Sequence, residues 1–278
     1  MTSISDLSKA FLRISTASLL AYFASSTSVL AENTGGLSEA ERDFLRSKFQ
    51  QQLLESELAV GRDPRSIRAY SDRGDAALFL GNFPQAIADF EKMIALDPSE
   101  DPKHWRLGIA YYFVGSFTKS ARQFEKYHAY DGRDRENGIW KFLAQVPVDG
   151  VERARTEMLT YPRFDREPFP LLYAMFAGQK TPDDVFADLE RRGLKKDPEI
   201  LFFANYYCAL EEQRLGHPAR AEELLAAAVA NPVGHSARGG AGYMWQVARL
   251  HWERLQAARQ LPQRNRPAPR PPQTPPPN

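Results

Sequence analysis

The sequence predicts an all-α fold, a solenoid in which helix pairs stack side by side. Residues 67–100 match residues 101–134 at a shift of 34 positions. Apolar residues recur at helical spacing over most of the chain. Glycine and alanine stand where the two helices of one pair would have to approach closely. Because a single helix pair cannot bury its apolar face alone, we expect neighbouring pairs to stack.

The repeated segment has the length and pattern of a tetratricopeptide repeat, a helix–turn–helix unit of 34 residues. The paired positions are Gly74 with Gly108, Gly81 with Gly115, Phe90-Glu91-Lys92 with Phe124-Glu125-Lys126, and Asp97 with Asp131. Stacked repeats build an extended concave surface, which usually binds protein segments and seldom performs chemistry. The sequence therefore predicts a tetratricopeptide-repeat-type solenoid with irregular central helix pairs and capping helices.

Residues 1–31 have the features of a secretory signal peptide. Lys9 and Arg13 precede a short apolar stretch, and residues 29–31 suit the sites that signal peptidase reads. The stretch is shorter than the ~20 apolar residues that span a bilayer, so we expect no membrane span. Without a nearby cysteine, lipid attachment at this site is not expected. We predict a periplasmic or secreted protein, cleaved near Ala31.

Residues 32–66 are expected to form an N-terminal capping helix. Ser38 and Glu41 are spaced as a capping box, in which each side chain satisfies a backbone N–H group of the other residue. The helix is predicted to run to about Val60. Its apolar stripe should cover the open face of the first repeat (Leu45, Phe49, Leu53 and Leu54).

Residues 67–134 contain the two regular repeats. Pro98 ends the first of them, because proline cannot continue the helical hydrogen bonding. Met93 and Tyr127 stand where alanine is common in such repeats, so we expect somewhat irregular packing. Residues 135–196 lose the strict period but keep the pattern of helix pairs. One pair is predicted on either side of a turn at 146–150, and another begins near Pro168.

The period returns in residues 197–232 as a third, similar repeat. Five positions lie 135 residues beyond their equivalents in the first repeat, one short of four periods (Ala209, Gly216, Ala221, Leu225 and Ala228). The central region is therefore one residue shorter than a whole number of repeats, which shifts the repeat register by one position. Residues 233–261 are predicted to hold a C-terminal capping helix, from about Ala241 to Arg259. Residues 262–278 are rich in proline and should form a disordered tail.

The composition excludes several classes of function. A formal net charge of +1 gives no electrostatic reason to expect nucleic-acid binding. Five histidines are scattered without metal-binding spacing, and no phosphate loop, nucleophile elbow or dinucleotide motif occurs. The charged segment 131–136 is interpreted as a solvated turn, since it lacks the register of a calcium loop. We therefore expect no enzyme, catalytic residue, cofactor or metal.

Cys208 is the only cysteine, so no intramolecular disulfide can form. Aromatic residues on both sides of it are typical of a helix that faces a core. We expect a buried structural cysteine. A reactive thiol and an intermolecular bridge are the alternatives.

The repeat register places one stripe of each first helix on the concave surface. Aromatic and aliphatic residues on that stripe are candidate partner-binding residues, because buried aromatic anchors dominate interface energies. The second repeat contributes Trp105, Ile109, Tyr112 and Phe113, and the third contributes Phe203, Tyr206, Leu210 and Arg214. The alternative is that neighbouring helices cover these side chains and make them ordinary core.

The chain also resembles the NlpI family of bacterial envelope proteins. The similarity lies in Leu107–Tyr112 through Trp140–Ala144 and in Leu224–Asn231, within residues 67–232. The resemblance implies an all-helical, homodimeric adaptor that brings peptidoglycan-cleaving endopeptidases to a periplasmic processing protease. The chain departs from that family by lacking a lipid-bearing cysteine and by its proline-rich segment.

We therefore expect an exported scaffold that mediates protein–protein interactions in the bacterial cell envelope and regulates peptidoglycan hydrolases or their proteolysis. Its partners would be other envelope proteins. The alternative from another class is an enzyme or a small-ligand-binding protein that uses a central pocket of the solenoid.

Overall fold

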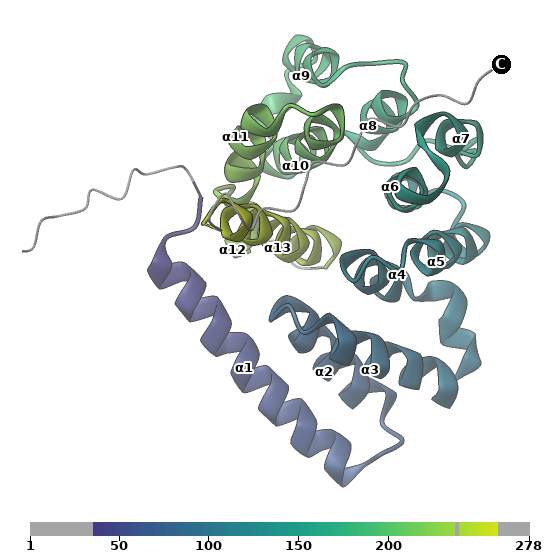
Figure 1. The fold of residues 1–278 in the computed structure, drawn as a ribbon, viewed down its shortest axis with the longest axis vertical. Coiled ribbons are helices and arrows are strands. Elements are labelled where there is room, and N and C mark those ends of the chain that lie inside the picture. The colour runs from purple at the N-terminus through teal and green to yellow at the C-terminus, as the bar shows by residue number, and fades with distance from the viewer. Residues whose placement is uncertain (1–35, 237–238, 261–278) are drawn as a thin grey trace, which may run out of the picture. The chain divides into compact units, whose positions relative to one another are not determined.

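The structure is a computed structural model that describes residues 36–236 and 239–260, all within one compact unit. These residues form thirteen α-helices and two short 3-10 helices, with no strand among them (Figure 1). The all-α prediction is confirmed. None of the helices in the described ranges combines the length and apolarity that crossing a membrane requires. The predicted signal peptide and proline-rich tail lie outside the described residues.

Helix α1 (Glu39–Arg62) begins with the capping box that the sequence predicts. The Ser38 hydroxyl accepts a hydrogen bond from the Glu41 N–H group at 3.2 Å, and the Glu41 carboxylate accepts one from the Ser38 N–H group at 2.8 Å. Phe49 packs against Phe79, with 4.9 Å between ring centroids. Leu54, predicted to lie on the buried stripe, is instead 62% exposed, because α1 packs against the next helix along one narrow face.

The first two helix pairs occupy the segments of the 34-residue repeat. Helices α2 (Ile67–Phe79) and α3 (Phe83–Leu96) form the first pair. The 3-10 helix η1 (Pro98–Lys103) leads to the second pair, α4 (Trp105–Phe113) and α5 (Phe117–Tyr130).

The two pairs share the same helix crossing. A Cβ atom built on Gly74 would lie 2.5 Å from the Phe90 ring, and one built on Gly108 would lie 2.8 Å from the Phe124 ring. Both phenylalanines are fully buried. In each pair a glycine therefore lets the first helix rest directly on an aromatic ring of the second, at equivalent positions of the repeat.

The central helices are shorter and less regular. They are α6 (Arg135–Asp149), α7 (Val151–Thr156), α8 (Phe169–Phe176), α9 (Pro182–Arg191) and the 3-10 helix η2 (Leu194–Lys196).

The turn predicted at 146–150 is displaced, because α6 continues through Pro147 to Asp149. Pro147 lies in the last turn of the helix, where losing one backbone hydrogen bond does not stop it.

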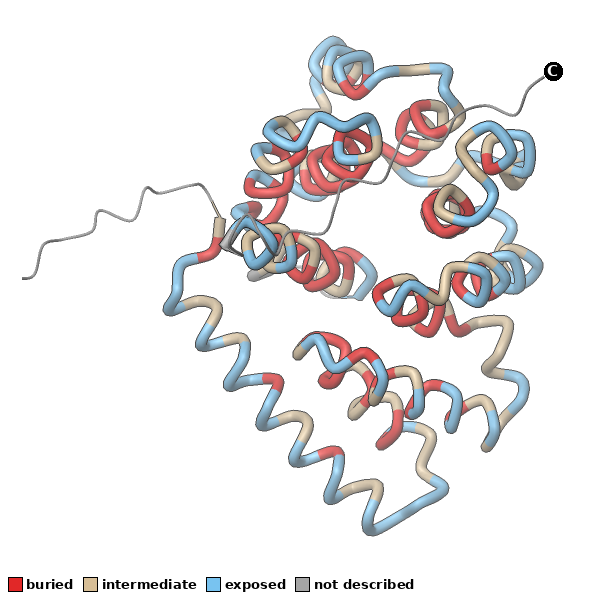
Figure 2. Tube along the Cα trace, in the orientation of Figure 1, coloured by how far each residue is buried: buried red, intermediate tan, exposed pale blue. Residues whose placement is uncertain are grey.

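Helices α10 (Pro198–Leu215) and α11 (Pro218–Val229) form the last pair, followed by the short α12 (Val233–Ser236). Helix α10 is buried along most of its middle section (Figure 2). Cys208 is a free cysteine with no exposed surface, so the predicted buried cysteine is confirmed.

Helix α13 (Gly240–Gln260) lies on the inner side of the helix pairs, between helices that are far apart in the sequence (Figure 1). The sequence predicts a cap on the last repeat, and α13 does pack against α11. It also contacts the opposite end of the chain, since Arg249 donates a hydrogen bond to the Phe79 carbonyl at 2.6 Å. Arg254 donates another to the Phe113 carbonyl at 3.0 Å. Helix α13 therefore joins the first repeats to the last one.

Candidate functional site

Five of the eight predicted partner-binding residues are buried, and Trp105, Tyr112 and Arg214 are half-buried. Ile109, Phe203 and Tyr206 have at most 1% of their surface exposed and belong to the hydrophobic core. Their environment fits the alternative interpretation from the sequence, in which neighbouring helices cover the stripe. The Tyr206 hydroxyl lies 2.8 Å from Nδ1 of His251, so α13 is part of that cover.

Four of the other predicted residues line one cavity of about 690 Å³, which we name the α13 groove. Tyr112 and Phe113 come from α4, and Leu210 and Arg214 come from α10. The sequence assigned these residues to different repeats, and the structure brings them together. Helix α13 supplies a further wall with His251, Arg254 and Leu255.

The α13 groove combines apolar walls with positive charge. The Arg214 guanidinium is paired with Glu211 at 2.6 Å. The Arg254 guanidinium lies 4.9 Å from the ring centroids of both Phe83 and Phe113, and no described carboxylate forms an ion pair with it. Burial lowers the pKa of His251 to about 3, so this imidazole is neutral at physiological pH. Arg254 therefore carries the uncompensated charge of the groove.

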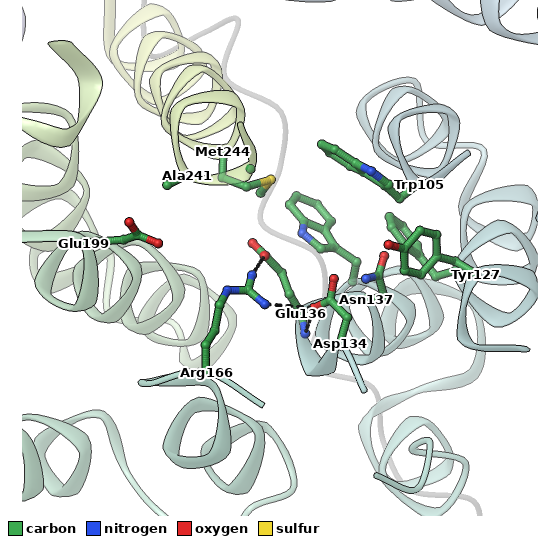
Figure 3. A pocket seen from close by; sticks show the side chains of 12 residues that line it. Trp105, Tyr127, Asp134, Glu136, Asn137, Arg166, Glu199, Ala241 and Met244 are labelled. Carbon is green, nitrogen blue, oxygen red and sulfur yellow. Dashed lines mark hydrogen bonds and ion pairs between the residues drawn. The ribbon is translucent and has the colours of Figure 1, made fainter. Parts of the chain in front are cut away.

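A second cavity, which we name the central pocket, has a volume of about 400 Å³. Its walls come from α4, α5, α6, α10 and α13 and from the segment before α8, and Figure 3 shows its lining side chains. Trp105 is the only predicted partner-binding residue that lines it. Its other walls include Tyr127, Glu136, Asn137, Arg166 and Met244.

Segment 131–136, interpreted from the sequence as a solvated turn, supplies two carboxylates of this pocket. That interpretation is wrong for its second half. The Asp134 carboxylate caps α6 by accepting a hydrogen bond from the Glu136 N–H group at 3.1 Å. Glu136 then lies in the first turn of the helix with only 8% of its surface exposed.

One arginine holds three carboxylates at the edge of the pocket. The guanidinium of Arg166 lies 2.5 Å from Glu136, 3.3 Å from Asp165 and 3.4 Å from Asp134, and Figure 3 shows its pairs with Glu136 and Asp134. A single positive charge therefore faces three negative charges. Burial raises the pKa of Asp134, and Arg166 only partly opposes this effect.

Glu136 is held from the opposite side by two core residues. The Trp140 N–H group donates to the Tyr207 hydroxyl at 3.0 Å, and that hydroxyl donates to the Glu136 carboxylate. Burial raises the pKa of Glu136 to about 7, although the Arg166 charge and the Tyr207 hydrogen bond act in the opposite direction. The group is therefore partly protonated near neutral pH.

Residue Asn137 is only 4% exposed, and its side-chain amide forms no hydrogen bond with the described residues. It lines the central pocket beside Tyr127 (Figure 3). Its amide atoms are not fully enclosed, so they reach the open space of the pocket. Asn137 therefore presents both a donor and an acceptor to whatever enters the pocket.

Across the described ranges, no cluster of three or more histidine, cysteine, aspartate or glutamate side chains has an arrangement that could hold a metal ion. Comparison with known proteins adds no assignment. The chain matches no protein-family model, and no curated protein is significantly similar to it.

Proposed function

We propose that the chain is a tetratricopeptide-repeat-type scaffold that binds protein partners in the bacterial cell envelope after export. The main support is that two helix pairs cross in the same way, 34 residues apart. Gly74 packs on Phe90 in the first pair, and Gly108 packs on Phe124 in the second. Such repeats present surfaces for protein segments and seldom act as enzymes. The partners would be envelope proteins, among them peptidoglycan hydrolases and the protease that degrades them, and the scaffold would act as a homodimer.

The α13 groove is the partner-binding surface that fits this function best. It retains accessible volume beside four of the predicted residues, of which Tyr112 and Arg214 are half-buried. Its walls are apolar, and Arg254 supplies a charge with no carboxylate partner among the described residues. We infer that the partner inserts an extended or helical segment with apolar side chains and one carboxylate.

Site-specific photo-crosslinking in the native cell would test this function. A crosslinking amino acid at Val114, an exposed position on the groove, should yield a discrete protein adduct. Arg254→Glu should abolish the adduct by repelling the carboxylate, whereas Arg46→Glu on α1 should not. Identical adducts from Val114 and from the exposed Phe164, which does not line the groove, would argue against it. Fractionation of the same cells would test the envelope location.

The central pocket favours a second candidate from a different class, a small-ligand-binding protein or an enzyme. The supporting observation is Asn137, whose buried amide faces the cavity without a partner. Glu136 titrates near neutrality, as a general acid–base group would need to do. A turnover that Glu136→Gln abolishes, with substrate binding retained, would favour the enzyme.

A further inference from the structure

We propose that the central pocket binds an organic cation, an ammonium or guanidinium group carried on an apolar body. The proposal rests on the second candidate function, because it names the ligand class of that pocket. Three independent features of the pocket support a cationic ligand: its charge, its aromatic residues and its unpartnered amide.

The described residues that line the pocket carry a surplus of negative charge. Asp134, Glu136 and Glu199 contribute carboxylates, and Arg166 is the only lysine or arginine among them. Arg166 is shared further with Asp165 behind the pocket. Carboxylates withdrawn from water are stable only when they are compensated, and burial accordingly raises the pKa of both Asp134 and Glu136. A bound cation would supply the missing charge.

Aromatic rings stand beside these carboxylates (Figure 3). Trp105 and Tyr127 are half-buried and line the pocket together with Trp140. The electron-rich faces of such rings attract cations and also cover apolar groups. Carboxylates and aromatic rings lining the same pocket match a ligand that combines a charged head with an apolar body.

The unpartnered amide of Asn137 completes the recognition. Its oxygen lines the pocket and can accept a hydrogen bond from an N–H donor of the ligand. An anionic ligand would meet the surplus carboxylates and be repelled. A neutral sugar could stack on the rings but would leave the negative charge uncompensated.

The volume of about 400 Å³ falls at the small end of the range for ligand pockets, so the ligand is compact. Two sources supply this chemistry, a free amine or guanidine and the lysine or arginine side chain of a partner protein. Glu199 is exposed at the rim, where either source could enter.

Calorimetric titration of the full chain would test the proposal. The probes are agmatine as a free cation, Nα-acetylarginine methylamide as a protein side chain, and N-acetylglucosamine as a neutral polar ligand. We expect a cationic probe to bind, with at least fivefold weaker binding in Glu199→Gln and in Trp105→Leu. Glu223→Gln, an exposed carboxylate on α11, is the matched control and should bind as the wild type does.

Binding at pH 7 should also release protons, because the cation lowers the pKa of Glu136. The measured heat should therefore depend on the ionisation enthalpy of the buffer, and this dependence should vanish in Glu136→Gln. Tighter binding of agmatine would identify a free small molecule, and tighter binding of the capped arginine would identify a partner side chain.

Two results would overturn the inference, and they are distinguishable. Binding of N-acetylglucosamine without binding of either cation would keep the pocket as a ligand site but remove the cation. Binding of no probe by the folded wild type, with unchanged circular dichroism, would remove both the cation and the second candidate function.

Discussion

Gly74 and Gly108 stand where the partner helix leaves no space for a side chain. Alanine at either position would place its Cβ atom within 3 Å of a fully buried phenylalanine ring. We expect each change to lower the free energy of unfolding by about 1–3 kcal/mol, the usual cost of overpacking a core. Urea unfolding followed by circular dichroism would measure it.

The matched control for these changes is Gly61→Ala in α1. A Cβ atom at Gly61 would have no neighbour within 4 Å. Since alanine favours helix over glycine, this variant should be unchanged or more stable by up to about 1 kcal/mol. Equal effects at Gly61, Gly74 and Gly108 would contradict the proposed role of the close helix crossing.

Glu136 makes stability depend on pH. Its folded pKa, about 7, lies above the ordinary value of 4.5, so the folded state holds the proton more tightly than the unfolded state. Stability from this group is therefore present below pH 4.5 and falls as the pH rises through 7, by up to about 3 kcal/mol.

Glu136→Gln should remove this loss, because glutamine stays neutral at every pH. Its single amide oxygen can keep the hydrogen bond from Arg166, and its NH2 group can donate to the Tyr207 hydroxyl. Urea unfolding of both proteins between pH 5 and pH 8 would show it as a flatter profile for the variant. Parallel profiles would show that Glu136 is ionised throughout the range.

The sequence predicted the central pocket poorly, and Glu136 shows why. In the sequence it stands in a run of alternating acidic and basic residues, which usually marks a solvated turn. Its burial depends on Tyr207 and Arg166, which lie 71 and 30 positions away in the chain. Local pattern carries no information about such neighbours. Trp105 was identified because it belongs to the repeat register itself.

At the scale of elements, Arg249 connects α13 to the first repeat. Its side chain is 6% exposed, and it donates hydrogen bonds to the Phe79 carbonyl at 2.6 Å and to Glu253 at 2.7 Å. It also donates to the Gln246 side chain at 2.8 Å, so Arg249→Met keeps the apolar bulk but leaves three acceptors without this donor. We expect a loss of about 2–4 kcal/mol in the free energy of unfolding.

Arg46→Met on α1 is the control for this prediction. Its ion pair with Asp43 is more than half exposed on both sides, so its loss should change the free energy of unfolding by less than about 0.5 kcal/mol. If Arg249→Met is equally mild, α13 is held mainly by its apolar contacts.

The sequence predicted the helices better than their packing. The repeat register located α2 to α5 because their capping, turn and spacing signals are all local. Pro147 was overestimated as a turn signal, since a proline near a helix end costs little. The inner position of α13 was not predicted, because it depends on surfaces presented by α2, α4 and α10 together.

At the scale of the whole molecule, α13 should make unfolding more cooperative than in an open solenoid, whose repeats contact only their neighbours. All four tryptophans report on this helix. Trp245 and Trp252 belong to it, the Trp105 ring lies 4.7 Å from that of Tyr243, and the Trp140 ring lies 6.2 Å from that of His251.

We therefore expect the urea transition seen by tryptophan fluorescence to coincide with the one seen by far-ultraviolet circular dichroism. In Arg249→Met we expect the two transitions to separate, with the fluorescence transition at the lower urea concentration. An earlier fluorescence transition in the wild type would contradict this prediction, because it would show that α13 detaches while the other helices remain folded.

The inner position of α13 also has a consequence for biosynthesis. The ribosome makes this helix after every helix that it covers, so the nascent chain emerges with the apolar inner sides of α4 and α10 bare. Those sides remain open to chaperones until α13 has been made and has left the ribosome. A premature stop codon within α13 should consequently yield an aggregating product, although every repeat upstream of it is intact.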